Sequence, residues 1–252
     1  MRSIKLKHIR IIAICVALSL SLHIHAQHFG IAISGGGGSY KMSDLKYYQE
    51  FLLAGFPVEG KMISLFPPYF TGGVSVFRTM NAYLRMGIDY NYSSTGARAY
   101  YSDYSGSRSS DMIVKAHQIG VSANYRLLGD NKFELLATAS LSATISKLEI
   151  SELISASSIY FAGISSGYNS TYKSTSPAVS VGLEGLYHGD RYSFGIDAGY
   201  YHDFTNDLIY AQDSSYKLTD PNDSERILTS DWSGFRAHVK IIFWFSKPQR
   251  DD

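Results

Sequence analysis

Charged side chains at alternate positions are the feature of this sequence with the greatest capacity for chemistry. They stand in segments whose intervening residues are apolar, and a spacing of two places each set on one face of a β-strand. The basic members are Arg85, Arg126, Arg236 and Lys240, and the acidic members are Asp89, Glu134, Glu184 and Asp197. Charges brought together inside a narrow ring of strands must be paired or hydrated, because an isolated buried charge is too costly. The pattern therefore predicts a structural network of salt bridges, and a narrow conduction path or gate is the alternative.

Other residues able to do chemistry are scattered. After residue 26 the histidines stand at 28, 117, 188, 202 and 238, and only His202 has an acidic neighbour, Asp203. Neighbours in a strand point to opposite faces, so this pair is not expected to act as an acid–base couple. The acidic run 220–225 lacks the glycine of a calcium-binding EF-hand loop and is expected to form a solvated turn around Pro221. We therefore expect no catalytic residue, cofactor or metal, and a lipid-modifying enzyme is the least favoured function.

The first 26 residues are interpreted as a secretory signal peptide, because a basic start precedes an apolar run and Ala26 offers a cleavage point. The apolar run, 11–22, is too short to span a bilayer as a helix. Removing residues 1–26 leaves 19 basic against 22 acidic side chains, a net charge of −3, which argues against a nucleic-acid partner. The only cysteine, Cys15, leaves with the signal, which excludes disulfides and cysteine metal sites. Residues 27–252 are expected to form a single domain.

Eight segments of the remaining chain alternate apolar and polar residues over about the length that a tilted membrane strand needs. They are 29–34, 70–76, 84–92, 118–126, 133–145, 179–188, 192–200 and 232–245. In the last segment Phe235, Val239 and Ile241 alternate with Arg236 and Lys240, so one face is apolar and the other basic. This pattern suits a barrel in lipid, whose apolar side chains point outward and whose polar side chains fill the lumen. The sequence predicts an all-β fold, a closed eight-stranded antiparallel up-and-down transmembrane β-barrel.

The links between these segments alternate in length. The short links are 79–81, 128–131 and 188–190, and the long links are about 40–68, 97–113, 150–173 and 205–230. Outer-membrane barrels have short periplasmic turns and longer outer loops, so both termini are expected in the periplasm and four loops outside. In the first long link, Ser43 is expected to cap one short helix that carries Leu45, Tyr48 and Leu52 on one face and ends near Gly55. A lid over the barrel mouth and a packed loop are the two interpretations of this helix.

The signal peptide, the eight alternating segments and the terminal aromatic residues Phe243 and Phe245 resemble those of small bacterial outer-membrane β-barrel proteins of the OmpA, OmpX and OmpW type. The run 92–106 also resembles a loop found in members of the outer-membrane β-barrel domain family. This resemblance implies a place in the bacterial outer membrane, contact with its lipids, and recognition of Phe243 and Phe245 by the barrel-assembly machinery. It implies a structural or surface-interaction role through outer loops whose ligand is unknown. A narrow OmpW-like channel for small solutes is the alternative.

Overall fold

The computed structural model describes residues 29–55, 60–104, 106–130, 132–158 and 161–245. The predicted signal peptide lies outside these ranges. Within the described ranges, no helix is long and apolar enough to cross a membrane.

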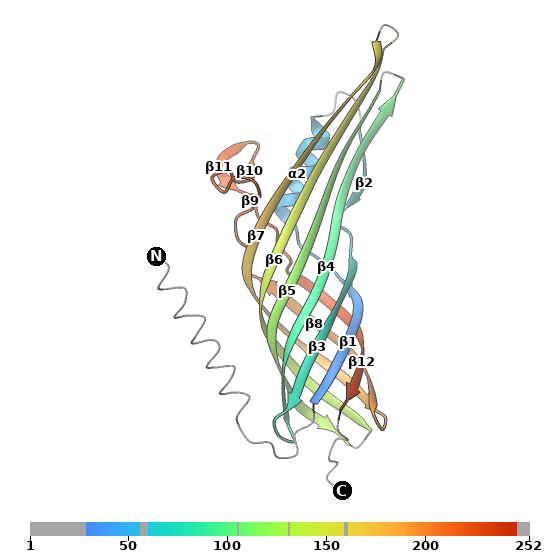
Figure 1. Ribbon diagram of the computed structural model, residues 1–252, viewed down its shortest axis with the longest axis vertical. Coiled ribbons are helices and arrows are strands. Elements are labelled where there is room, and N and C mark those ends of the chain that lie inside the picture. The colour runs from blue at the N-terminus through green and yellow to red at the C-terminus, as the bar shows by residue number, and fades with distance from the viewer. Residues whose placement is uncertain (1–28, 56–59, 105, 131, 159–160, 246–252) are drawn as a thin grey trace.

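Eight strands of the described chain pair edge to edge and close into a ring (Figure 1). They are β1 (Phe29–Gly38), β3 (Tyr69–Thr79), β4 (Leu84–Asp103), β5 (Gly106–Gly129), β6 (Phe133–Ser158), β7 (Phe161–His188), β8 (Tyr192–Asp203) and β12 (Gly234–Trp244). Each pairs antiparallel with the next ring strand along the chain, and β1 closes the ring by pairing with β12. The predicted closed up-and-down barrel is confirmed.

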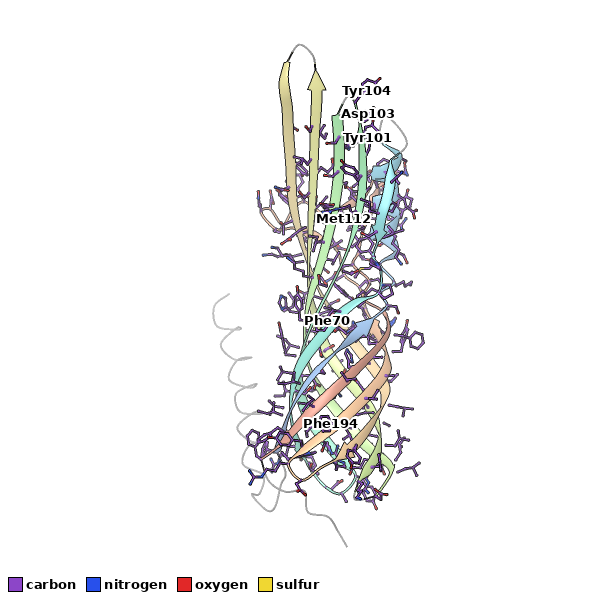
Figure 2. All side chains as sticks on the ribbon, turned by 90° about the vertical axis from the view of Figure 1, so that its right-hand side faces the viewer. Phe70, Tyr101, Asp103, Tyr104, Met112 and Phe194 are labelled. Atoms are coloured by element: carbon purple, nitrogen blue, oxygen red, sulfur yellow. The ribbon has the colours of Figure 1, made fainter. Side chains whose placement is uncertain are left out.

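The outer wall of the ring is apolar and its inner wall is largely polar, as the alternation predicts. On β12, Phe235, Val239 and Ile241 are 54% to 70% exposed, whereas Arg236 is 8% exposed. Exposed aromatic side chains gather in two rings, which include Phe133, Tyr187 and Tyr192 beside the short turns and Tyr90, Tyr200 and Phe235 at the opposite end. Aromatic rings of this kind mark the two interfaces of a bilayer. We call the exposed apolar side chains between them the apolar belt; Phe194 in Figure 2 belongs to it.

Four neighbouring strands, β4 to β7, continue far beyond the ring as one sheet (Figures 1 and 2). We call this continuation, residues 94–103, 106–116, 146–158 and 161–177, the outer sheet. Its pairing is unbroken up to Asp103 opposite Gly106, and β6 pairs with β7 up to Ser158 opposite Phe161. The prediction of long loops at 97–113 and 150–173 is therefore wrong, because both segments are hairpins made by the membrane strands themselves.

Apolar residues change face where the outer sheet leaves the ring. On β5, Ile119 and Val121 point outward and are 50% and 53% exposed, whereas Met112 and Val114 point inward and are fully buried. A change of phase within an alternating sequence looks like the end of a strand. The backbone of β5 continues through this point, and only its surroundings change. Within the ring, lipid covers the outward face of the strand; in the outer sheet, protein covers its inward face. The change of phase explains why the sequence pattern indicated loops.

The inward face of the outer sheet is covered by the first and last long links. These supply α2 (Ser43–Ala54), β2 (Lys61–Leu65), β9 (Ile209–Tyr210), β10 (Thr219–Asp220) and β11 (Asp223–Ile227). Strand β2 pairs with β4, and β9 pairs with β7, so the two links flank the sheet. Together they enclose an apolar core that includes Leu45, Met112, Leu148, Leu208 and Trp232. The core lies above the ring and fastens the loops to it.

The predicted helix in the first link is confirmed, but its predicted cap is wrong. Helix α2 begins at Ser43, and the residue at its N-cap position is Met42, which has a left-handed backbone with φ of 44° and makes no side-chain capping bond. Met42 and Leu45 are fully buried, so packing holds the start of this helix in place. Gly55 follows its last residue, as predicted.

Candidate functional site

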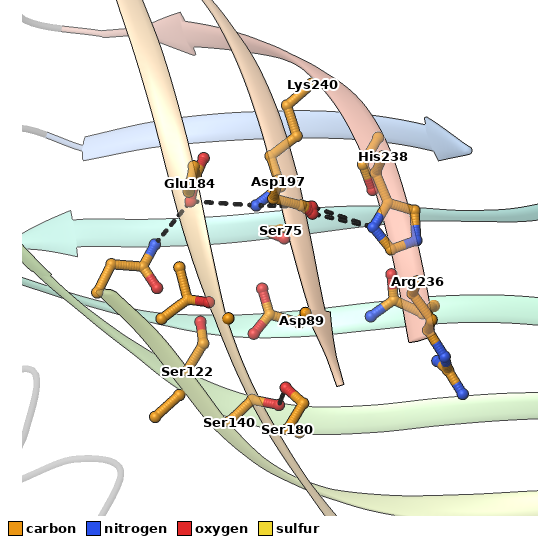
Figure 3. Close-up of a pocket in the computed structure, with 18 of the residues that line it drawn as sticks. Ser75, Asp89, Ser122, Ser140, Ser180, Glu184, Asp197, Arg236, His238 and Lys240 are labelled. Carbon is orange, nitrogen blue, oxygen red and sulfur yellow. Dashed lines mark hydrogen bonds and ion pairs between the residues drawn. The ribbon is translucent and has the colours of Figure 1, made fainter. Parts of the chain in front are cut away.

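The ring encloses a polar cavity of about 150 Å³, shown in Figure 3. Side chains from β4, β7, β8 and β12 line it and include Asp89, Glu184, Asp197, His238 and Lys240. The inward phase of each strand brings these residues to the cavity, and antiparallel pairing sets them at similar heights. Asp197 and His238, for example, are direct partners in the β8–β12 ladder.

One ion-pair cluster occupies the middle of the lumen. The Lys240 ammonium lies 3.2 Å from a Glu184 oxygen and 3.8 Å from an Asp197 oxygen. Asp197 also accepts from His238 Nδ1 at 2.9 Å, and Asn124 donates to Glu184 at 3.4 Å. Glu184 is only 2% exposed, so its charge depends on these partners rather than on water.

A second cluster lies toward the short turns. Glu134 pairs with Arg85, and its carboxylate is 3.7 Å from Arg126 Nε and 3.1 Å from His188 Nε2. The Arg85 guanidinium also stands over the Trp244 ring, with its central carbon 5.3 Å from a ring centroid. Two arginines and a histidine on three different strands thus converge on one carboxylate, which ties the strands together across the lumen.

Among the described residues, neither of the remaining two predicted members joins a salt bridge. Arg236 donates to Gln118 Oε1 at 2.6 Å and to the Trp232 carbonyl at 3.3 Å, and it stacks 3.7 Å above the Tyr201 ring. Asp89 lines the cavity, and within the described part of the chain no ion pair within 4.0 Å involves it. Six of the eight predicted lumen charges are therefore gathered into two clusters, while these two stand apart.

Apolar side chains lie at both ends of the polar cavity. Toward the periplasm, a buried cluster comprises Ala32, Phe77, Leu136, Leu186, Ile242 and Trp244. Toward the outside, Trp232 is fully buried, donates from its indole to Ser146 Oγ at 2.8 Å, and meets Tyr40 edge-on at 4.9 Å. Sequence reasoning missed these ends, because it assigned the inward positions to polar residues. The signal was available in Phe77 and Trp244, which are apolar at positions where the alternation calls for polar residues.

The other chemistry-bearing residues of the sequence are not assembled into a site. His202 is exposed and meets the Phe204 ring edge-on, whereas Asp203 is buried and accepts from Ser176 Oγ at 2.5 Å. In the last loop, Asp220 accepts from Arg226 at 3.0 Å rather than pointing outward. Within the described ranges, no group of three or more His, Cys, Asp or Glu side chains could hold a metal ion.

The two edges of the outer sheet differ. On one edge, β2 covers β4 between Ala97 and Tyr100. On the other edge, β9 covers β7 only at Tyr172 and Lys173, and Ala211 adds one hydrogen bond to the Thr171 carbonyl at 2.8 Å. Within the described chain, no strand pairs with this edge beyond that point. The upper part of β7 therefore presents backbone donors and acceptors to solvent.

No protein-family model and no curated protein sequence matches this chain. Among solved structures, it is similar to Neisserial surface protein A, at 11% identity and a TM-score of 0.42, over 87% of this chain and 99% of that one. A major outer membrane protein from Thermus thermophilus is similar at 12% identity and a TM-score of 0.44, over 88% and 100% of the two chains. Ail, the attachment invasion locus protein of Yersinia pestis, is similar at 13% identity and a TM-score of 0.31, over 86% and 96%.

The place of this protein in the cell follows from its own surface rather than from those similarities. A closed antiparallel barrel with an apolar belt between two aromatic rings is the structure that spans the bacterial outer membrane. The protein is an outer-membrane barrel that contacts the lipid bilayer. Its short turns lie on the periplasmic side, and the outer sheet stands on the cell surface.

Proposed function

We propose that this protein is a closed anchor that presents the outer sheet to a partner at the cell surface. The observation that carries the proposal is the continuation of β4 to β7 above the ring with a buried core of its own. A loop that serves only to link two membrane strands needs a few residues. Strands of 20 to 28 residues, supported on one face by α2, build a rigid surface instead.

The free edge of β7 is the part of the outer sheet best suited to recognition. An exposed edge strand can accept an extended segment of another protein by backbone hydrogen bonding. Natural proteins usually blunt such edges, and this chain does so on β4 by means of β2. The edge above Thr171 has no such cover in the described chain, which supports a binding role for it.

A photo-cross-linking amino acid at Asn169 tests this proposal on intact cells. The Thr171 carbonyl points to the free edge, since Ala211 reaches it from there, and alternation gives the backbone groups of Asn169 and Gly167 the same direction. The Asn169 side chain itself is exposed beside this edge, above the part of β7 that β9 covers. We expect adducts with a surface partner from Asn169 but not from Ile63, which is 61% exposed on β2, the short strand that covers β4. Gly167→Pro, which removes a donor at the free edge while sparing the β6 ladder, should abolish the adducts. Equal adducts from both edges, or none from Asn169, would overturn the proposal.

We also propose that the charged lumen is a structural plug. Salt bridges in the middle of the lumen and apolar clusters at both ends support this proposal, and an eight-stranded ring has little spare width. The cavity is the observation that favours the alternative, a narrow channel. Planar-bilayer recordings separate the two: a plug predicts little steady current, with current appearing or becoming unstable in Asp197→Asn. A stable current from the unchanged protein would favour the channel.

Phe243 lies on the last strand and packs against Tyr192, and Phe245 directly follows that strand and is 63% exposed. We propose that the barrel-assembly machinery reads these side chains, as the resemblance to small outer-membrane barrels implies. Phe245→Ala should reduce the amount of barrel inserted in cells without changing the stability of the protein refolded in vitro. An equal loss in both settings would make Phe245 a structural residue only.

A further inference from the structure

Three lysines stand side by side on the outward face of the outer sheet. Lys115 on β5 is directly opposite Lys147 on β6, which is directly opposite Lys173 on β7. Neighbouring strands are about 4.8 Å apart, so the three side chains leave the sheet within about 10 Å of one another. We call these three residues the lysine row.

The charge of the lysine row is only partly balanced. Glu149 lies 3.3 Å from the Lys115 ammonium and 2.5 Å from the Lys147 ammonium, so one carboxylate serves two lysines. Lys173 is exposed, and among the described residues no ion pair within 4.0 Å involves it. Like charges directly opposite one another destabilise a sheet. The lysine row has two positive charges in excess despite this repulsion. The excess charge indicates that an anion from outside the chain binds there.

The height of the lysine row indicates which anion that is. On β6, Ile145 is 44% exposed in the apolar belt, and Lys147 is the next outward residue. Phe133, in the periplasmic aromatic ring, stands 14 positions earlier, which at roughly 3.4 Å per residue and a tilt of about 40° is about 36 Å lower. A bilayer has a hydrocarbon core about 30 Å thick and spans about 40–45 Å with its headgroups. Lys147 therefore emerges within the outer headgroup layer.

We infer that the lysine row binds phosphate groups of lipid headgroups in the outer leaflet. The face that carries it is continuous with the apolar belt, so the lipids that touch Ile145 and Ile119 bring their headgroups to the row. Ammonium groups on flexible stems suit phosphate oxygens, which accept charge-assisted hydrogen bonds from several directions. This site is separate from the free edge of β7 and stands whether or not that edge binds a partner.

Titration of lipid A against the purified full-length protein in neutral detergent, followed by native mass spectrometry, tests the inference. Wild type should bind lipid A and bind its dephosphorylated form far more weakly. A basic residue near an anionic surface contributes roughly a fivefold change in affinity, so replacing all three lysines by Gln should weaken binding on the order of 100-fold. The matched control removes the same charge from Lys41, Lys46 and Lys61, which lie in the first long link, and should change affinity only a few-fold.

Stability measurements show that the loss is not a folding defect. In phosphatidylcholine vesicles the triple Gln variant should unfold at a urea concentration close to that of wild type, since relief of repulsion within the row offsets the loss of the two exposed pairs with Glu149. If it does not fold, Lys173→Gln alone should give the fivefold loss, because that side chain supports no ion pair among the described residues. Equal lipid A binding by wild type and the triple Gln variant, or an equal loss in the control, would overturn the inference. So would row-dependent binding of heparin with no effect on lipid A, since the ligand would then be a soluble polyanion.

Discussion

Replacing Trp232 by Ala should release the last long link from the outer sheet while the ring stays folded. The indole is fully buried, donates to Ser146 and packs edge-on against Tyr40. Truncating a buried Trp to Ala costs about 3–5 kcal/mol. The hydrogen bond accounts for about 1 kcal/mol of this and the edge-on contact for a similar amount. We therefore expect a loss of about 4 kcal/mol, confined to the apolar core above the ring.

Native-state hydrogen exchange measures this loss locally. The amides of Leu208, Leu218 and Leu228 hydrogen-bond to one another's carbonyls within the last link, at 3.2, 2.9 and 2.8 Å. A loss of about 4 kcal/mol corresponds to roughly a thousandfold drop in their protection, if they open locally. Trp232→Phe keeps most of the ring but loses the donor, so it should cost about 1–2 kcal/mol and roughly tenfold in protection.

Tyr216→Ala is the control, because that side chain belongs to the same link but is 66% exposed. It should change the protection of the three leucine amides by less than about 0.5 kcal/mol. Amides of the ring, such as those of β12, should be unaffected by all three substitutions. Unchanged protection in Trp232→Ala, or the same loss in the Phe and Ala variants, would refute the view that the packed and hydrogen-bonded indole holds the last long link against the outer sheet.

Three further predictions concern the lumen, the ring and the outer sheet. Glu184→Gln leaves the partly buried Lys240 without its nearer partner and should cost about 3–5 kcal/mol in urea unfolding. Lys240→Met in the same chain should restore most of this loss, and an additive second loss would contradict the pairing. Gly36→Ala would place a Cβ atom 1.9 Å from the Ala237 carbonyl oxygen, so refolding yield should fall, whereas Gly185→Ala meets nothing within 4 Å and should match wild type. Hydrogen bonds from Lys147 and Lys115 lower the pKa of Glu149, so its contribution to stability is full above its ordinary pKa and is lost as pH falls through the lowered value. Exchange protection of the outer sheet should therefore drop in acid in wild type but less so in Glu149→Gln, and an identical acid response in the two proteins would count against this pairing.

The ring could be predicted from the sequence because contact with lipid strictly limits which residues can stand at its outward positions. Every outward position within the apolar belt faces acyl chains, so Val239 and Ile241 alternate with polar residues and the strand is recognisable. The partners of the lumen charges were harder to predict. Which acid meets which base depends on strand register and on the shear of the ring, and neither can be read from one strand at a time. Lys240 could be placed in the lumen from its phase, but its pairing with Glu184, two strands away, could not.

The outer sheet could not be predicted from the sequence because its apolar residues change face where the strands leave the membrane. A β-strand keeps its backbone pattern when it leaves the membrane, but the side that must be apolar is set by whatever covers it. Below the change of phase on β6, Ile145 faces lipid; above it, Leu148 faces the core beneath α2 and Lys147 faces outward. The position of the change therefore marks the membrane surface on β5 and β6. The lysine row follows this change of phase on β5, β6 and β7, as it should if its charges were selected for headgroups rather than for a partner further out.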